Sequence, residues 1–124
     1  MPAWVAIGLA GALGAWARYL VGLAMQRHAA DFPWGTFTVN VAGCVLIALA
    51  LGIADRVPSW SFALRGMFAT GFVGAFTTMS TFSLETWTLL QSSPLRAAGY
   101  VVASVAGGLC GVALGGWAAG HVPL

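Results

Sequence analysis

The sequence predicts an all-α integral membrane protein with four transmembrane helices, and three observations support this fold class. The 124 residues are 60% hydrophobic and only 6% charged. A soluble domain of this size cannot bury so much apolar surface, whereas a helix that spans a bilayer needs about 20 mostly apolar residues. Three short polar clusters, each with a proline, divide the chain into four apolar segments. We therefore expect one membrane domain over residues 1–124.

The four apolar segments are expected to form helices over roughly 2–25, 34–54, 61–90 and 95–119. Small residues recur at helix-packing spacing in the first and fourth segments, as Gly8/Ala12, Gly11/Ala15 and Gly107/Gly111/Gly115. Such spacing lets helix backbones approach closely in lipid. The pattern therefore predicts a narrow bundle.

The third segment differs from the others in length and composition. Its 30 or so residues are more than the hydrocarbon core requires at about 1.5 Å per residue. Gly71 and Gly74 come shortly before Thr77 and Thr78. We therefore expect a break near the centre of this segment, not one long tilted helix.

The arginines give almost no preferred orientation in the membrane. An even number of spans places Arg27 and Arg96 at one face and Arg56 and Arg65 at the other. Arg18 lies inside the first segment, where it is weak evidence for topology. Because orientation follows the excess of Lys and Arg on one side, we expect the chain to insert both ways and to pair antiparallel.

Polar side chains concentrate in the third segment, at residues 71–88. Three- and four-residue steps place one set near a single helix face: Thr77, Ser80, Thr81, Glu85 and Thr88. Met79 and Phe82 form a neighbouring apolar strip. Hydroxyl donors beside an aromatic ring edge can replace the water shell of a small ion. The alternative is that these hydroxyls bond back to carbonyls of their own helix.

Two other segments add polar groups at membrane depth. Thr36 and Asn40 share a face of the second segment, and the Asn40 amide can line a path or make an interhelical clasp. Arg18 in the first segment can attract anions to an aqueous vestibule, or it can pair with Glu85.

Other function classes find little support in the sequence. Five arginines against three acidic residues are too few for a nucleic-acid interface. Cys44 and Cys110 lie in apolar segments without metal-ligand spacing, and are interpreted as small core residues. No paired acids, metal-ligand set or activated nucleophile is present, so we do not expect an enzyme.

Three motifs resemble the Fluc (CrcB) fluoride channels: GALGAWARYL in the first segment, WGTFTVNVAGC in the second and GFVGAFTTMSTFSLE in the third. The resemblance covers nearly the whole chain in length and motif order. It implies a dual-topology, antiparallel homodimer in the cytoplasmic (inner) membrane that exports fluoride passively through two pores. It also implies a structural Na⁺ at the dimer centre.

The resemblance also assigns roles to residues. Asn40 and Phe82 would face the fluoride pathway, Ser80 and Thr81 would form a polar track beside it, and Arg18 would attract anions at the vestibule. Further matching positions are Thr36, Glu85 and, less closely, Ser104. The backbone oxygens of Gly74 and Thr77 from both chains would hold the Na⁺, as a hard cation prefers oxygen ligands.

One position departs from the family pattern. The family motif usually reads TTFSTF, whereas this chain reads TTMSTF, with Met79 in place of the first phenylalanine. A thioether is polarizable but has no hydrogen-rich ring edge. Either the ion passes Met79 with help from neighbouring hydroxyls, or rate and selectivity differ from those typical of the family.

Two alternative functions remain. A small four-helix multidrug exporter driven by protons would need an acid in its first helix, where this chain has Arg18 and no acidic residue in positions 1–30. A non-transporting membrane assembly subunit would need only glycine packing and aromatic belts. It would leave the polar strip of the third segment unexplained.

Overall fold

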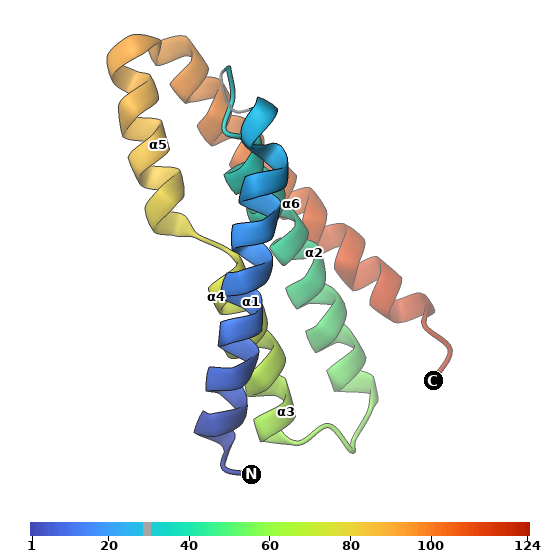
Figure 1. Ribbon diagram of the computed structural model, residues 1–124. Helices are drawn as coiled ribbons and strands as arrows, with labels where there is room; N and C mark the ends of the chain where they lie inside the picture. Colours follow the sequence, from blue (N-terminus) through green and yellow to red (C-terminus); the bar gives the residue numbers. More distant parts are fainter. Residues whose placement is uncertain (29–30) are drawn as a thin grey trace.

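A computed structural model describes residues 1–28 and 31–124, and within these ranges the chain is helical with no strand. The helices in chain order are α1 (Ala3–Met25), the 3₁₀ turn η1 (Gln26–His28), α2 (Trp34–Arg56), α3 (Phe62–Gly66), the π-helix η2 (Met67–Val73), α4 (Gly74–Phe76), α5 (Met79–Ser92) and α6 (Pro94–His121) (Figure 1). The expected all-α class is confirmed. The observed α2 and α6 each end two residues later than expected.

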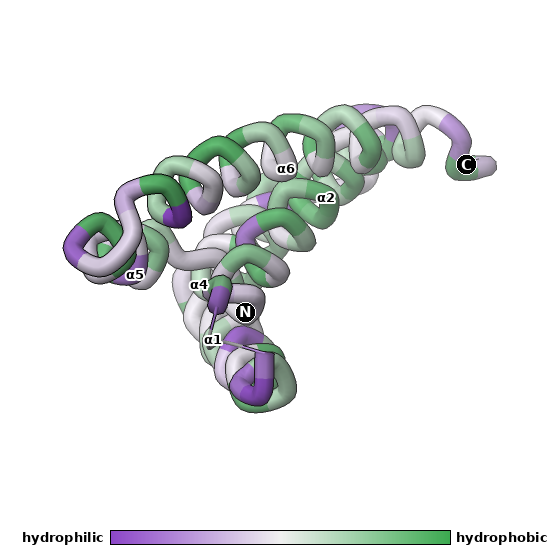
Figure 2. The backbone as a smooth tube through the Cα atoms, turned by 90° about the horizontal axis from the view of Figure 1, so that it is seen from above, coloured by the Kyte–Doolittle hydropathy of each residue, from purple (hydrophilic) through white to green (hydrophobic). Residues whose placement is uncertain are grey.

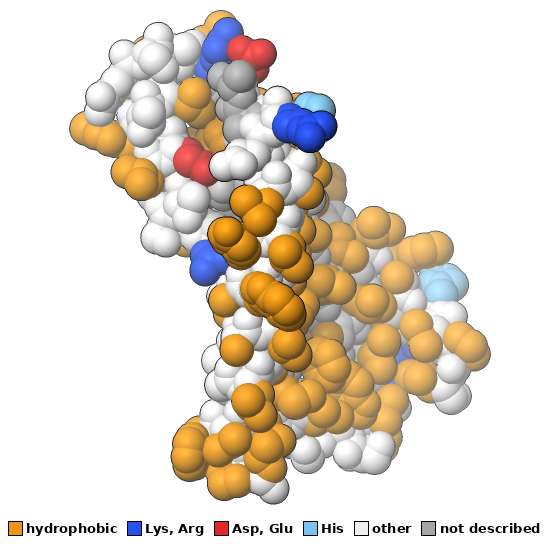
Figure 3. Space-filling view, viewed as in Figure 1, with side chains coloured by type: hydrophobic (Ala, Val, Ile, Leu, Met, Phe, Trp, Pro, Cys, Tyr) orange, Lys and Arg blue, Asp and Glu red, His pale blue; other side chains and the backbone are white. Residues whose placement is uncertain are grey.

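Three of the helical stretches are long and apolar enough to cross a membrane. They cover Ala3–His28, Trp34–Arg56 and Pro94–His121. Large hydrophobic side chains cover much of the molecular surface between the ends (Figure 3). Because a soluble protein would bury such side chains, the chain is a multi-pass membrane protein.

The expected break in the third segment is present at Thr77 and Thr78. Both have extended backbones, with φ −85° and ψ 161° at Thr77 and φ −151° and ψ 110° at Thr78. The Thr77 N–H and hydroxyl both donate to the Val73 carbonyl, each at 3.0 Å, and close the first half of the segment. The Thr78 Oγ1 accepts the Thr81 N–H at 3.2 Å and caps α5.

The glycines of this segment do not supply a special backbone conformation, because no glycine in the described residues has a positive φ. Gly71 is needed for space. A Cβ there would lie 2.7 Å from the Ile7 carbonyl oxygen of α1. Gly71 therefore lets α1 lie close against η2, whereas a Cβ at Gly74 would make only an ordinary contact within its own segment.

Two helix pairs form the body of the molecule. α2 runs beside α6, and α1 runs beside η2 and α4, while α5 packs against α6 at one side (Figures 1 and 2). Gly111 and Gly115 of α6 face the backbone carbonyls of Val41 and Val45. This confirms the predicted packing role of the glycines in α6. A Cβ at Gly8 would meet open space, so the prediction was wrong there within one chain.

The two ends of the bundle carry the same number of arginines as each other, and the same number of aspartates. At one end Arg65 bonds to Asp55 at 2.7 Å, and Arg56 donates to the carbonyls of Ala119 and Val122 at the end of α6. At the other end Arg27 lies in η1, and Arg96 lies 3.7 Å from Asp31. Each end thus has two arginines and one aspartate.

The close contact between α2 and α6 predicts a sharp difference between two adjacent glycines. Gly115→Ala should lower the thermal midpoint in detergent, since overpacking costs about 1–3 kcal/mol. Gly116→Ala is the matched control, because a Cβ at Gly116 meets nothing within 4 Å. Thermal unfolding followed by size-exclusion chromatography measures both. Equal midpoints for the two variants would contradict the described helix packing.

Candidate functional site

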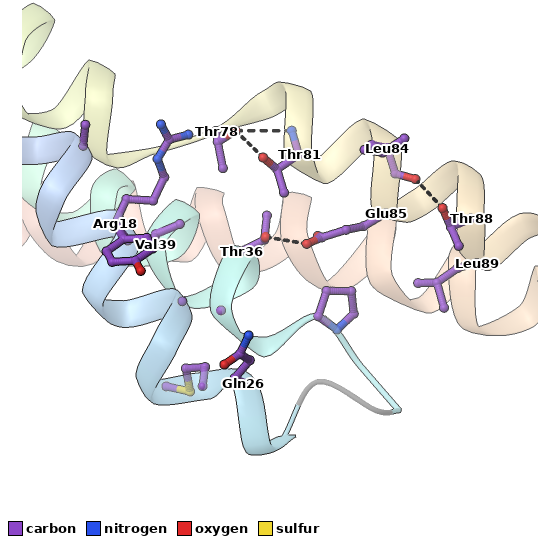
Figure 4. A pocket seen from close by; sticks show the side chains of 16 residues that line it. Arg18, Gln26, Thr36, Val39, Thr78, Thr81, Leu84, Glu85, Thr88 and Leu89 are labelled. Atoms are coloured by element: carbon purple, nitrogen blue, oxygen red, sulfur yellow. Dashed lines mark hydrogen bonds between the residues drawn. The ribbon is translucent and has the colours of Figure 1, made fainter.

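A pocket of about 790 Å³ with both apolar and polar lining lies between α1, α2 and α5. Its polar lining consists chiefly of Arg18, Gln26, Thr36, Thr78, Thr81, Glu85 and Thr88 (Figure 4). It extends from the break to Met25 and Pro33, at the end where α1 finishes. Arg18 and Glu85 are its only charged lining residues, so the lining carries one charge of each sign.

Glu85 ties α5 to both neighbouring helices. The Thr36 hydroxyl of α2 donates to Glu85 Oε1 at 2.8 Å, and the Tyr100 hydroxyl of α6 donates to Oε2 at 2.7 Å. Both carboxylate oxygens therefore have donors. Tyr100 is fully buried and Thr36 is 8% exposed, so this cluster fixes the wall of the pocket.

Arg18 extends from α1 toward the part of the pocket where Thr78 and Thr81 lie (Figure 4). The alternative pairing with Glu85 does not form. Among the described residues, Arg18 makes neither an ion pair nor a side-chain hydrogen bond. A cation without a direct partner raises the concentration of anions in its immediate surroundings.

Asn40 bridges α2 to the break. Its Nδ2 donates to the Thr78 carbonyl at 3.1 Å, and its Oδ1 accepts the Thr78 N–H at 2.7 Å. The interhelical clasp considered from the sequence is therefore formed, with a backbone partner. An amide nitrogen has two hydrogens, so Asn40 keeps one further donor.

The hydroxyls at the start of α5 are linked to one another. The Thr78 hydroxyl donates to Thr81 Oγ1 at 3.0 Å and lies 3.3 Å from Ser80 Oγ. In this arrangement Thr81 receives a hydrogen and keeps its own for another acceptor. The predicted polar track of Ser80 and Thr81 is thus joined to the break through Thr78.

Other hydroxyls bond back to their own helix. Thr77 donates to Val73, Thr86 to Phe82 and Thr88 to Leu84, at 2.7–3.0 Å. For these three the alternative interpretation of the sequence holds. Ser104 is different, because its buried Oγ has no hydrogen-bond partner among the described residues.

The two residues of the predicted apolar strip lie in different surroundings. Phe82 packs edge to face on Tyr100, with ring centroids 5.0 Å apart, and Tyr100 packs in the same way on Phe32 at 5.2 Å. Met79 is 72% exposed and does not line the pocket. Within one chain, only Phe82 of this pair lies among the other predicted site residues.

A metal ion could be held here by backbone oxygens but not by acidic or soft side chains. The described residues contain no group of three or more His, Cys, Asp or Glu side chains suited to a metal. The Thr78 N–H, which a continuous helix would give to the Gly74 carbonyl, goes to Asn40. The break therefore frees the Gly74 oxygen, and Gly74 is exposed. A free carbonyl suits a hard cation.

Two residues of the site were missed by the sequence analysis. Thr78 is 7% exposed and connects Asn40 to the polar track, and Tyr100 holds Glu85 and Phe82. The signal for Thr78 was its place as a capping threonine three residues before Thr81. The signal for Tyr100 was its four-residue spacing from Ser104, which puts both polar groups on one face of α6.

The sequence is similar to one protein family and to several of its members over most of its length. The model of the family described as CrcB-like protein, Camphor Resistance (CrcB), matches residues 5–116. A protein from Acidobacterium capsulatum is 47% identical over 114 residues, or 90% of each chain. One from Chloroflexus aurantiacus is 45% identical over 122 residues, or 94% of this chain and 97% of its own. One from Bordetella avium is 43% identical over 113 residues, or 90% and 88%.

All three relatives carry the name fluoride-specific ion channel FluC. These names denote ion channels and not enzymes, which agrees with the expectation from the sequence. They also denote neither a multidrug exporter nor an assembly subunit. Because the family match and the similarities extend over most of the sequence, the chain belongs to the CrcB-like family.

Proposed function

We propose that this protein is a passive, fluoride-selective channel of the bacterial inner membrane that exports fluoride and so relieves its toxicity. The observation that carries the proposal is a set of uncommitted hydrogen-bond donors inside an otherwise apolar bundle: Asn40, Thr81 and Ser104. The shared name of the relatives supports fluoride as the ion.

The path that we propose begins at the pocket. Arg18 draws the anion into it, and the Thr81 and Ser80 hydroxyls take over part of its water shell. The second Nδ2 hydrogen of Asn40, the Phe82 ring edge and the Ser104 hydroxyl then supply further donors. A small anion gives up water only where donors replace it. A narrow path lined by neutral donors therefore excludes larger halides by size.

Glu85 and Thr36 form part of the wall beside this path. The carboxylate oxygens already accept from Thr36 and Tyr100, so these two hydroxyls are held in place. With Arg18 opposite, the pocket lining has no net charge. Selection in this proposal therefore depends on donor geometry and size, and not on a strong positive field.

We also propose that two copies pair antiparallel, each with four transmembrane segments. Helix α5 has no buried residue, and Ser80 and Ser83 on it are exposed. Polar groups that face lipid are costly, so a second protomer or water must cover them. Met79, exposed on the same helix, would then face the partner or the ion. Equal arginine and aspartate content at the two ends permits either orientation.

The Na⁺ belongs to the same proposal. A two-fold axis in the membrane plane would bring the breaks of two chains together. The Gly74 and Thr77 carbonyls of both copies would then offer four oxygens to the ion. The exposed position of Gly74 and its freed carbonyl support this arrangement.

Fluoride efflux from liposomes, followed with a fluoride-selective electrode, tests the proposed function directly. Ser104→Ala should slow efflux about tenfold, a loss of roughly 1.4 kcal/mol of stabilisation for the passing ion. Thr86→Val is the control, because its hydroxyl is already bonded to the Phe82 carbonyl. No fluoride flux through the wild-type protein would refute the function. Equal flux in the two variants would remove Ser104 from the path.

Arg18 should act through long-range attraction. Arg18→Gln is expected to reduce fluoride flux several-fold at low salt, and the deficit should shrink as salt rises, because the screening length falls to about 10 Å at 0.1 M. Arg18→Lys should retain most of the flux. A deficit in Arg18→Gln that does not change with salt would show that the side chain acts by contact or by structure.

Antiparallel pairing predicts a definite labelling pattern. A cysteine or epitope placed at the N-terminus should be reached by an impermeant reagent from both sides of the membrane, in about equal amounts. In mild detergent the particle should contain two chains of 12.7 kDa each. Labelling from one side alone would exclude the antiparallel arrangement.

A further inference from the structure

We infer that Asn40 is a positioning residue that holds the break between α4 and α5 open. By taking over the Thr78 N–H, it keeps the Gly74 carbonyl free for a cation. The part that concerns the cation rests on the proposed function, whereas the clamp itself is a property of the fold.

The first support is the form of the contact. A primary amide presents one acceptor and one donor side by side, as a backbone peptide group does. Asn40 uses both toward one residue, accepting from the Thr78 N–H at 2.7 Å and donating to the Thr78 carbonyl at 3.1 Å. The side chain thus replaces the backbone partners that an interrupted helix loses.

The second support is where the displaced carbonyl is left. In a continuous helix the Gly74 oxygen would accept from Thr78, four residues on. A tighter turn would let it accept from Thr77, but the Thr77 N–H goes to Val73 at 3.0 Å. Neither N–H reaches Gly74. Without Asn40, the Thr78 N–H would have no fixed acceptor. The break would then become mobile, with this N–H either exposed to exchange or transiently bonded to the Gly74 carbonyl.

The third support is that α2 approaches the break at a second point on the same face. Gly43, three residues after Asn40, lies where any Cβ would collide with the Thr77 methyl group. Val39, beside Asn40, is 1% exposed, so this stretch of α2 is firmly packed. Asn40 and Gly43 together hold Thr77 and Thr78 from one side.

This role differs from that of a simple anion donor. A donor to the passing ion would affect fluoride flux and leave the resting backbone of the break unchanged. A clamp controls the backbone whether or not fluoride is present. The spare Nδ2 hydrogen lets Asn40 fill both roles, so the experiment must measure the backbone itself.

Hydrogen–deuterium exchange of the purified full-length protein in lipid nanodiscs measures how well the backbone of the break is protected. The relevant peptide covers residues 74–82. Asn40→Leu, which has a similar shape but neither hydrogen bond, should increase exchange of the Thr78 amide at least tenfold. Thr36→Val is the matched control on α2, because it removes the bond to Glu85 and leaves Asn40 in place. Retained protection at residues 107–115 shows that the variant is folded.

Asn40→Asp provides the chemical signature. A protonated carboxyl has one donor and one acceptor and can restore both bonds, whereas a carboxylate only accepts. Exchange at Thr78 should stay close to that of the wild type at both acid and alkaline pH, because either form accepts the Thr78 N–H. The thermal midpoint should fall at alkaline pH, where the carboxylate no longer donates to the Thr78 carbonyl and faces it with a negative charge. Unchanged exchange in Asn40→Leu overturns the inference. A thermal midpoint for Asn40→Asp that differs from that of the wild type by the same amount at acid and alkaline pH overturns the reciprocal bonding.

A second experiment tests the link to the cation. It compares the thermal midpoint in sodium chloride with that in N-methyl-D-glucamine chloride. Sodium should raise the thermal midpoint of the wild type, and Asn40→Leu should lose this shift. A sodium shift that persists in Asn40→Leu overturns the link between the clamp and the cation. If sodium does not shift the midpoint of the wild type, the proposed cation site is refuted. The exchange data still test whether Asn40 holds the break. Fluoride flux, measured separately, decides on the channel.

Discussion

Backbone polar groups within a bilayer must find partners inside the protein, and the interruption at Thr77 and Thr78 is where this constraint is most demanding. The fold meets it with side chains. The Asn40 side chain accepts the Thr78 N–H and donates to the Thr78 carbonyl, and the Thr78 hydroxyl caps α5. The polar chemistry that we assign to the channel is therefore built around the same few atoms that keep the broken segment stable.

Close helix contacts place these atoms correctly. The bundle has little side-chain core, and Tyr100 and Val39 are its largest fully buried residues. Backbone-to-backbone approach at Gly71, Gly111 and Gly115 substitutes for that core. Such contacts leave little room for adjustment. At each of these glycines the nearest atom to an added Cβ is a backbone carbonyl oxygen, which cannot move aside as a flexible side chain can. The spacing of α1 against η2 and of α2 against α6 is thus set by direct backbone contact.

Much of this architecture could be predicted from the sequence. Hydropathy and proline positions located the helical segments to within a few residues, and excess length with two glycines located the break. The polar strip of α5 was also predictable from its spacing. The partners of those polar groups were not. Asn40 and Thr78 are 38 residues apart, and Thr36 and Glu85 are 49 apart, so their pairing depends on how the helices cross.

The same limit explains the residues that were missed or remained ambiguous. Tyr100 lies in an apolar segment without a sharp motif, and its importance comes from contacts with α5. Whether a threonine bonds to its own helix depends on its rotamer, which spacing does not determine. Thr86 and Thr88 do so, whereas Thr81 keeps a free hydrogen.

The rings of Phe32, Tyr100 and Phe82 pack edge to face in a row and join the α1–α2 connection to α5. Phe32 belongs to the connection between α1 and α2, and Phe82 lies a turn into α5. Tyr100 touches both rings and also donates to Glu85, so one side chain of α6 contacts the α1–α2 connection and two residues of α5. The connection between α1 and α2 and the start of α5 thus share one buried tyrosine as their common contact.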